Sequence, residues 1–175
     1  MVKKNKAIFF DRDGTLIKTF ISKKNIPIAI KNYEDIKFEN NSNLVVKHFK
    51  KKYLIFIITN QPDVSRGKNL KKNVILINSI VKEKLGIKKI YTCYSDKDKN
   101  FMRKPNPGMI YKAQKEYNLN LKKSYVVGDR YKDILAGKRA NCKTILINKK
   151  YNSSSQVEPD FKINNLKDLL KIIKV

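Results

Sequence analysis

Six short apolar runs alternate along the chain with longer segments in which apolar residues recur every three or four positions. Short apolar runs that end in polar residues are typical of buried strands, and the wider spacing is typical of amphipathic helices. The expected strands are AIFFD, YLIFIIT, KIYTCY, SYVVGD, KTILIN and DFKI, and the expected helices cover residues 43–52, 69–85, 107–117, 131–141 and 166–173. This alternation predicts an α/β fold built on a mainly parallel sheet.

The segment 17–39 fits neither pattern, and we expect it to form an inserted loop or small flap. The chain of 175 residues has the length of one domain, and its 41% hydrophobic content is sufficient for a sizeable core. The sequence therefore predicts a single domain over residues 1–175.

No apolar run approaches the length of a membrane-spanning helix or of a secretory signal, and the two cysteines form no closely spaced pair. We expect a soluble cytoplasmic protein without a membrane partner and, although nothing in the sequence determines the oligomeric state, a monomer.

Polar residues with reactive side chains follow four of the expected strands. In open α/β sheets, ligands bind beyond the carboxyl ends of the strands, so these residues are expected to meet at one edge. They are Asp11, Arg12, Asp13, Gly14 and Thr15, then Thr59, Asn60 and Gln61, then Arg103 and Lys104, and finally Gly128, Asp129 and Asp133. Carboxylates brought together there would repel each other unless a cation lies between them. The edge therefore predicts a site for a hard divalent cation.

Mg²⁺ suits this set of side chains, because it prefers oxygen ligands and is commonly held by one or two carboxylates together with a phosphate. Arg103 and Lys104 would then bind the remaining phosphate oxygens. An aspartate that faces a metal-bound phosphoryl group can attack phosphorus and form an aspartyl phosphate. Asp11 and Asp13 lie two positions apart, on the same side of an extended strand end, so Asp13 could donate a proton to the leaving oxygen and later activate water. The pattern predicts a phosphatase.

Four motifs, DRDGTL, TNQ, RKPNPG and VGDRYKD, are similar in sequence and order to those of the haloacid dehalogenase (HAD) superfamily of phosphatases. The arginine between the two acids, TNQPDVSRG and RKPNPGM look most like its branch of D-glycero-D-manno-heptose 1,7-bisphosphate phosphatases and histidinol-phosphate phosphatases. The resemblance spans nearly the whole chain. It implies a three-layer Rossmannoid fold with only a small loop or flap as its cap.

The resemblance also implies roles for individual residues. Asp11 matches the nucleophile, and Asp13 matches the general acid/base, whose backbone carbonyl also binds Mg²⁺. Asp129 matches the remaining metal ligand, and Thr59 and Lys104 match the groups that hold the transferring phosphoryl group. Asn60 and Arg103 match substrate contacts, and Gln61, Arg66 and Arg130 are further candidate substrate-binding residues.

Two of these positions allow more than one interpretation. Arg66, in the loop after Gln61, either shapes that loop or reaches a second phosphate group of the substrate. Asp133 either caps the first turn of the helix that begins at Tyr131, where a negative charge is favourable, or supports the metal site. Both interpretations stay open for each residue at this point.

One part of the family pattern is missing from this chain. Many heptose bisphosphate phosphatases carry a Cys-x-His and a Cys-x-Cys pair before the Arg-Lys motif, and together these bind a structural zinc. The corresponding segment here is CYSDKDKNFMRKP, in which Cys93 is present, Ser95 replaces the histidine and no second cysteine follows. Zinc requires four nitrogen or sulfur ligands, so we expect the structural zinc to be absent.

The formal net charge of +25 favours a nucleic-acid partner, because Lys and Arg neutralise phosphates. The Lys-Lys pairs are nevertheless scattered over the whole chain, which favours a generally solvated basic surface. We therefore expect hydrolysis of a small phosphorylated metabolite, with heptose 1,7-bisphosphate as the substrate. The alternatives are a histidinol-phosphate phosphatase, a polynucleotide 3′-phosphatase, and a nucleic-acid-binding module with a vestigial active site.

Overall fold

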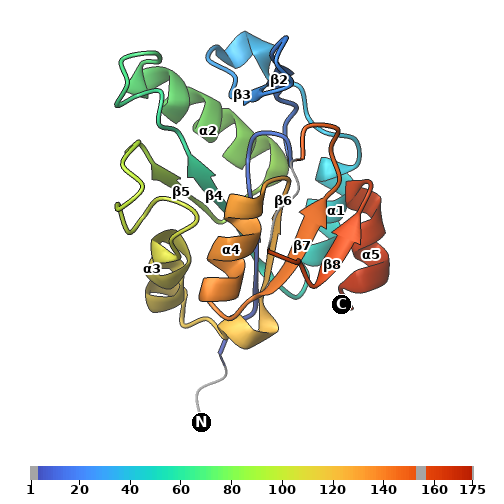
Figure 1. Cartoon of the computed structure of the whole chain (residues 1–175). Helices are drawn as coiled ribbons and strands as arrows, with labels where there is room; N and C mark the ends of the chain where they lie inside the picture. Colours follow the sequence, from blue (N-terminus) through green and yellow to red (C-terminus); the bar gives the residue numbers. More distant parts are fainter. Residues whose placement is uncertain (1–3, 153–156, 175) are drawn as a thin grey trace.

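A computed structural model describes residues 4–152 and 157–174 of the chain. Six strands in these residues form a parallel sheet in the order β5-β4-β1-β6-β7-β8 (Figure 1). Their bounds are β1 Ala7–Phe10, β4 Leu54–Asn60, β5 Lys89–Cys93, β6 Tyr125–Gly128, β7 Lys143–Ile147 and β8 Phe161–Ile163. Each lies within one of the expected apolar runs, apart from the last residue of β4, Asn60, which lies one position beyond its run, so the predicted parallel sheet is confirmed.

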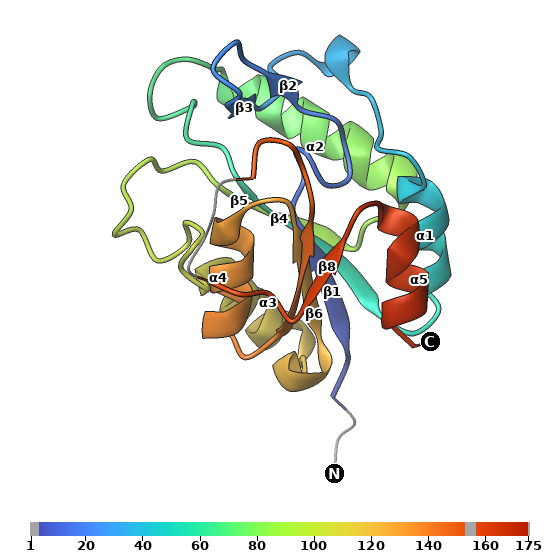
Figure 2. The same ribbon diagram turned by 45° about the vertical axis from the view of Figure 1, so that its right-hand side comes forward.

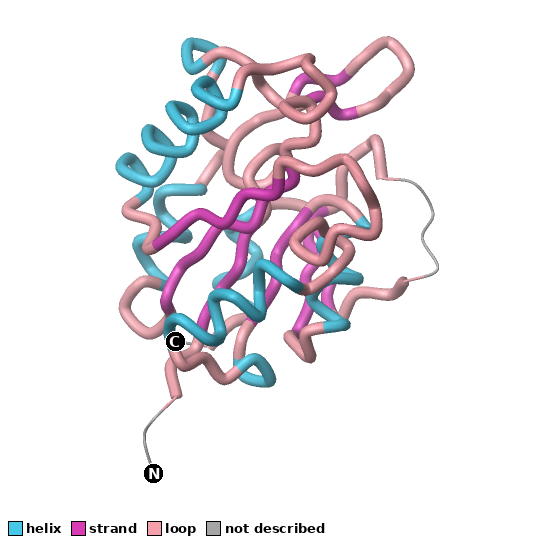
Figure 3. Tube along the Cα trace, turned by 90° about the vertical axis from the view of Figure 1, so that its left-hand side faces the viewer, coloured by secondary structure: helices cyan, strands magenta, loops and turns pink. Residues whose placement is uncertain are grey.

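Helices cover both faces of this sheet, and together with it they make the three layers visible in Figures 2 and 3. The helices α1, α2 and α5 pack on one face, and α3 and α4 pack on the other. Their bounds are α1 Ser42–Phe49, α2 Lys71–Leu85, α3 Gly108–Tyr117, α4 Tyr131–Arg139 and α5 Leu169–Ile172, and short 3₁₀ turns cover η1 Tyr33–Asp35, η2 Leu121–Lys123 and η3 Leu166–Asp168. The expected last helix is therefore divided into a 3₁₀ turn and a short α-helix, a common variation at helix ends.

Strand β1 is buried on both faces, which explains why its sequence is apolar without alternation. Ile8 and Phe10 pack into the core on the side of α1, α2 and α5, whereas Ala7 and Phe9 pack into the core on the side of α3 and α4. Strand β1 pairs with β4 on one side and β6 on the other. Asp11, the next residue, is therefore carried to the middle of the carboxyl edge of the sheet.

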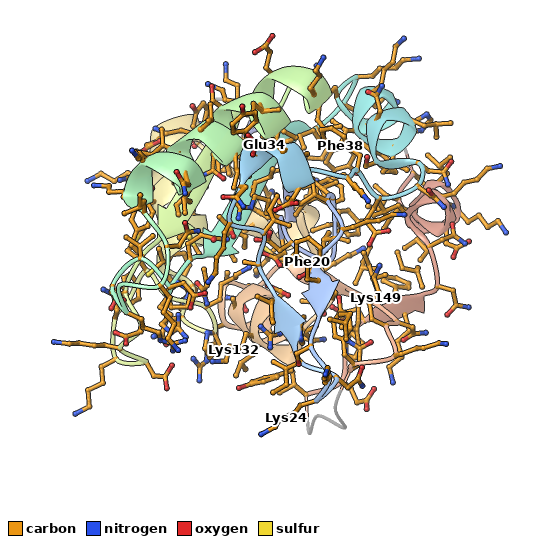
Figure 4. The ribbon with its side chains drawn as sticks, turned by 90° about the horizontal axis from the view of Figure 1, so that it is seen from above. Phe20, Lys24, Glu34, Phe38, Lys132 and Lys149 are labelled. Carbon is orange, nitrogen blue, oxygen red and sulfur yellow. The ribbon has the colours of Figure 1, made fainter. Side chains whose placement is uncertain are left out.

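Residues of the segment 17–39 lie above that edge as a small flap. It contains the antiparallel hairpin of β2 Phe20–Ile21 and β3 Pro27–Ile28, followed by η1. At the tip, the side-chain amide of Asn25 donates a hydrogen bond of 3.2 Å to the carbonyl of Lys150, which lies beyond β7. Seen from above, Lys132 and Lys149 lie on opposite sides of the hairpin (Figure 4).

No helix in the described part of the chain is long and apolar enough to cross a membrane. The assignment of residues 1–175 to a single domain stays a prediction.

Candidate active site

A cavity opens at the carboxyl edge of the sheet, beneath the flap. It is lined by Asp11, Asp13, Thr59, Asn60, Lys104, Asp129, Arg130, Lys132 and Asp133, together with Thr19, Pro27 and Ala29 of the flap. The structure thus brings together side chains from the ends of three neighbouring strands and from the loop that precedes α3. Three of the predicted residues, Gln61, Arg66 and Arg103, lie near this edge but are not among those that line the cavity.

Lys104 places its ammonium group between two carboxylates at the base of the cavity. The Nζ atom lies 2.7 Å from Oδ1 of Asp11 and 2.6 Å from Oδ1 of Asp133, and it donates a further 2.7 Å hydrogen bond to the carbonyl of Ile58. Burial alone would lower the pKa of Lys104, but the two carboxylates outweigh it and raise the pKa above its ordinary value. The ammonium group therefore stays charged next to Asp11.

The backbone of Lys104 is held by Asn60, at the end of β4. The side-chain amide of Asn60 donates to the carbonyl of Lys104 at 2.9 Å and accepts from its N–H at 3.1 Å. Both polar atoms of the amide are therefore used within the protein. A direct contact of Asn60 with the substrate stays a prediction.

Three carboxylates converge at the centre of the site, those of Asp11, Asp129 and Asp133, each offering an oxygen within 4.8 Å of the other two. Burial, followed by the negative charges of its two neighbours, raises the pKa of Asp129 to about 7. Burial likewise raises the pKa of Asp133 to about 6, although Lys104 opposes the shift. A set of buried oxygen donors, of which Asp129 and Asp133 resist ionisation because they are buried beside other carboxylates, fits a hard cation such as Mg²⁺.

Asp133 both caps a helix and forms an ion pair, because its two carboxylate oxygens contact different partners. Oδ2 accepts a 3.0 Å hydrogen bond from the backbone N–H of Arg130 and so caps the first turn of α4. Oδ1 forms the ion pair with Lys104. The helix cap and the position beside the candidate metal site therefore occur together.

The carboxylate of Asp13 is not part of this trio, and it accepts hydrogen bonds from two neighbouring side chains. The guanidinium of Arg12 donates to it through Nε at 3.1 Å and through Nη2 at 3.2 Å, and Gln61 donates through Nε2 at 2.8 Å. Gln61 also donates to Oγ1 of Thr59 at 2.9 Å. The side chain of Gln61 thus supports two residues of the cavity, and its own contact with the substrate stays a prediction.

The sequence of this chain matches a known protein family. The model of the family described as "Polynucleotide kinase 3 phosphatase" matches residues 6–166. The chain belongs to this family. It is accordingly a phosphatase, and the expected phosphoric monoester hydrolase activity agrees with the curated relatives.

Among those relatives, D-glycero-beta-D-manno-heptose-1,7-bisphosphate 7-phosphatase of Helicobacter pylori strain J99 is 30% identical over 99% of this chain and 100% of its own length. The D-glycero-alpha-D-manno-heptose-1,7-bisphosphate 7-phosphatase of Campylobacter jejuni is 31% identical over 98% of this chain and 97% of its own. The resemblance to heptose bisphosphate phosphatases seen in the motifs is thereby confirmed.

Solved structures confirm the HAD fold. The D,D-heptose 1,7-bisphosphate phosphatase from B. bronchiseptica, complexed with magnesium and phosphate, has a TM-score of 0.78 at 20% identity and covers 96% of this chain and 99% of its own. A HAD-like phosphatase from Mesorhizobium loti has a TM-score of 0.75 at 26% identity and covers 96% of this chain and 85% of its own.

Tyr151, in the loop after β7, is a site residue that the motifs of this family do not reveal in the chain. Its hydroxyl donates to Oδ2 of Asp129 at 2.6 Å, while Thr15 donates to Oδ1 at 3.1 Å and Asn152 donates to the backbone carbonyl. A Cβ atom on Gly14 would lie 2.5 Å from both Oδ2 of Asp129 and the Tyr151 hydroxyl, and its φ of +83° also favours glycine. No local pattern predicts Tyr151, because only the folded chain places it there.

Arg66 and Arg103 are both turned toward acids of the loop that follows β5. Arg103 is largely buried and donates to Oδ1 of Asp98 at 3.2 Å and to the carbonyl of Ser95 at 3.0 Å. Arg66 is exposed and lies 3.5 Å from Asp96. Substrate contacts of both arginines stay predictions, as does that of Arg130, which does line the cavity.

Lys132, which lines the cavity, is a second site residue without a sequence signal. It lies on α4 near several cations, and its pKa is lowered by partial burial and by the positive charge of Arg103, with Asp98 opposing the shift. A group of positive side chains thus borders the cavity on the side of α4.

The loop over residues 93–106, in which we expect no structural zinc, is held by side-chain amides. Asn106 donates from Nδ2 to the carbonyls of Asp98 and Asn100 at 2.9 and 3.0 Å, and Oδ1 of Asn100 accepts from the N–H of Met102 at 2.9 Å. The thiol of Cys93 lies 3.9 Å from the same Oδ1. The absence of a structural zinc stays a prediction.

Proposed function

We propose that this protein is a Mg²⁺-dependent phosphatase that hydrolyses D-glycero-D-manno-heptose 1,7-bisphosphate through an aspartyl-phosphate intermediate. The observation that carries the proposal is the placement of Asp11 at the base of the cavity, with the Lys104 ammonium 2.7 Å away and two further buried carboxylates beside it. A nucleophile, a fixed cation and an oxygen-lined metal site are the parts that phosphoryl transfer requires. Full-length similarity to two heptose bisphosphate phosphatases supports the substrate.

In the first step, a carboxylate oxygen of Asp11 attacks phosphorus and the bond from phosphorus to the ester oxygen breaks. Asp13 donates a proton to that oxygen, so the sugar leaves as an alcohol. Lys104 stabilises the charge on the transferring phosphoryl group. Because Gln61 already donates to Oγ1 of Thr59, the hydroxyl hydrogen of Thr59 is free to point toward a phosphoryl oxygen.

In the second step, Asp13 accepts a proton from a water molecule that attacks the phosphorus of the aspartyl phosphate. The bond between phosphorus and the Asp11 oxygen then breaks, which releases inorganic phosphate and restores both carboxyl groups to their starting states. The flap restricts access of bulk water to this site, because Thr19, Pro27 and Ala29 line the cavity from above.

The residues that would hold Mg²⁺ are Asp11, Asp129 and the backbone carbonyl of Asp13, with Asp133 and Tyr151 supporting them. When bound, the ion supplies positive charge that offsets the carboxylates and polarises the phosphoryl oxygens. The raised pKa values of Asp129 and Asp133 support this assignment, since burial beside other carboxylates holds back the ionisation of both acids, and a bound cation would offset this effect.

A substrate panel tests the proposal. The purified protein, supplied with Mg²⁺, should be assayed for phosphate release from heptose 1,7-bisphosphate, histidinol phosphate and a 3′-phosphorylated oligonucleotide. We expect the highest kcat/KM for the heptose bisphosphate, and no turnover of it by Asp11→Asn. A higher kcat/KM for histidinol phosphate would move the assignment to that alternative.

A second candidate, a polynucleotide 3′-phosphatase, is favoured by the name of the matching family and by the net charge of +25. The chemistry at Asp11 would be the same, and only the leaving group would differ. Turnover of the 3′-phosphorylated oligonucleotide much faster than of any sugar phosphate would establish this candidate.

A further inference from the structure

Arg12, which stands between the two catalytic acids, is completely buried. A buried guanidinium is costly unless its N–H groups find partners. On one edge, Nε and Nη2 form a bidentate pair with the carboxylate of Asp13. On the other side, Nη1 donates a short hydrogen bond of 2.7 Å to Oδ1 of Asn78, in the middle of α2. Asn78 is therefore the partner that holds the far side of this guanidinium.

The orientation of Asn78 is determined at both ends of its amide. Arg12 can only donate hydrogen bonds, so the amide oxygen must face it. The amide nitrogen donates to Oγ1 of Thr92 on β5 at 3.0 Å. A chain of hydrogen bonds thus runs from the sheet through α2 to Arg12 and on to Asp13.

The guanidinium in turn determines where the carboxylate of Asp13 points. Three donors hold this carboxylate, two from Arg12 and one from Gln61, and its side chain is only 12% exposed. A general acid must lie within hydrogen-bond reach of the oxygen that it protonates. Loss of the acceptor at Nη1 would leave Arg12 with an unpaired buried donor and free it to turn away from Asp13.

We propose that Asn78 is a positioning residue for catalysis. It holds the guanidinium of Arg12 so that the Nε and Nη2 groups orient the carboxylate of Asp13 toward the leaving-group oxygen. The proposal rests on the proposed function, because it assigns general-acid chemistry to Asp13. It places a determinant of the reaction on a helix that contributes no residue to the cavity lining.

Dependence on the leaving group tests this role. The value of kcat/KM reports the steps up to departure of the leaving group, so it isolates protonation by Asp13 from the later attack of water. The sugar alkoxide of heptose 1,7-bisphosphate needs a proton in order to leave, whereas p-nitrophenolate is a stable anion and leaves without one. The variants to compare are Asn78→Ala, Asn78→Leu and Asn78→Asp, with Asn73→Ala on the same helix as the matched control.

For Asn78→Ala, we expect kcat/KM for the heptose bisphosphate to fall about tenfold, because a misplaced Asp13 loses part of what general acid catalysis contributes. We expect kcat/KM for p-nitrophenyl phosphate to fall less than about twofold. Asn78→Leu, which fills the same space without an acceptor, should behave alike and takes the place of the alanine variant if that one does not fold. Asn78→Asp keeps the acceptor and should restore the wild-type ratio, and Asn73→Ala should not change it.

Equal losses on both substrates, or no loss on either, would overturn the positioning role, as would a failure of Asn78→Asp to restore the ratio. These outcomes are distinct from failure of the proposed function. If Asp11→Asn retained full turnover, the aspartyl-phosphate mechanism itself would be wrong, whatever the variants of Asn78 did.

Discussion

Asn60 and Lys104 are joined by two hydrogen bonds, from the side-chain amide of one residue to the backbone N–H and carbonyl of the other. The pair connects the end of β4 to the loop that precedes α3. Its consequence is that the Lys104 ammonium is presented to Asp11 at 2.7 Å. We therefore expect Asn60 to act on the reaction through Lys104.

The first prediction follows from this pair. Asn60→Ala removes both hydrogen bonds, so we expect kcat to fall about tenfold or more, because a small misplacement of a catalytic group has a large effect. KM for the sugar phosphate should change little, since Lys104 stabilises mainly the transferring phosphoryl group. Steady-state kinetics distinguish this from the substrate-contact role, in which KM would rise while kcat stayed near the wild-type value.

The second prediction concerns Tyr151. Its hydroxyl donates to a carboxylate oxygen of Asp129, the candidate metal ligand. Tyr151→Phe keeps the ring and removes the donor, and we expect the Mg²⁺ concentration for half-maximal activity to rise about tenfold, as for other residues that orient metal ligands. Tyr131→Phe, an exposed tyrosine on α4, is the matched control and should leave this concentration unchanged. An unchanged Mg²⁺ requirement in Tyr151→Phe would contradict the assignment.

The third prediction is a dependence of stability on pH and metal. The pKa values of Asp129 and Asp133, about 7 and about 6, lie above the ordinary value of 3.8. Between the ordinary and the raised values, the folded protein binds more protons than the unfolded chain, so the contribution of these acids to the free energy of unfolding falls as the pH rises. We expect the melting temperature of the metal-free protein to decline from about pH 4 to about pH 7 for this reason.

Mg²⁺ should reverse that decline, because it binds the ionised carboxylates. Differential scanning fluorimetry should show a larger increase in Tm on addition of Mg²⁺ at about pH 8 than at about pH 5. Asp129→Asn serves as the control, since it removes one of the two titrating groups and one ligand. An equal Mg²⁺-induced shift at both pH values would argue against these acids as the metal site.

The fourth prediction addresses the high positive charge. Binding of an oligonucleotide through scattered surface lysines should weaken steeply as salt is added and should show no preference for a 3′-phosphate end. Turnover of a sugar phosphate should respond less, because Lys104 is buried and screening acts weakly there. Fluorescence anisotropy and a phosphate-release assay over the same salt series make the comparison. Salt-resistant binding that depends on the 3′-phosphate would support the polynucleotide alternative.

Much of the fold follows from patterns that are local in the sequence. The apolar runs at Ala7–Phe10 and Leu54–Asn60 identify central strands because both faces of these strands are buried. The acids at positions 11 and 13 then fall at the carboxyl edge, since parallel strands end on the same side of a sheet. The cavity beneath the flap is the direct result.

The directions of the side chains could not be predicted in this way. Asn60 and Gln61 follow a strand as expected, but their amides form hydrogen bonds with Lys104 and Asp13, which other segments of the chain bring beside them. Tyr151 reaches Asp129 from a loop that no local pattern connects with the site. Such contacts depend on how distant segments pack against each other, and neither the spacing of residues nor the composition of the chain predicts that packing.

The most direct test of the account is to trap the phosphorylated enzyme. The protein should be mixed with substrate and Mg²⁺, quenched in acid within the first turnover, digested and examined by mass spectrometry. The account predicts one added phosphoryl group on the peptide that contains Asp11 in the wild-type protein, and none in Asp11→Asn, which should be folded and inactive. Turnover by Asp11→Asn at a rate near wild type, or a phosphoryl group on a different residue, would contradict it.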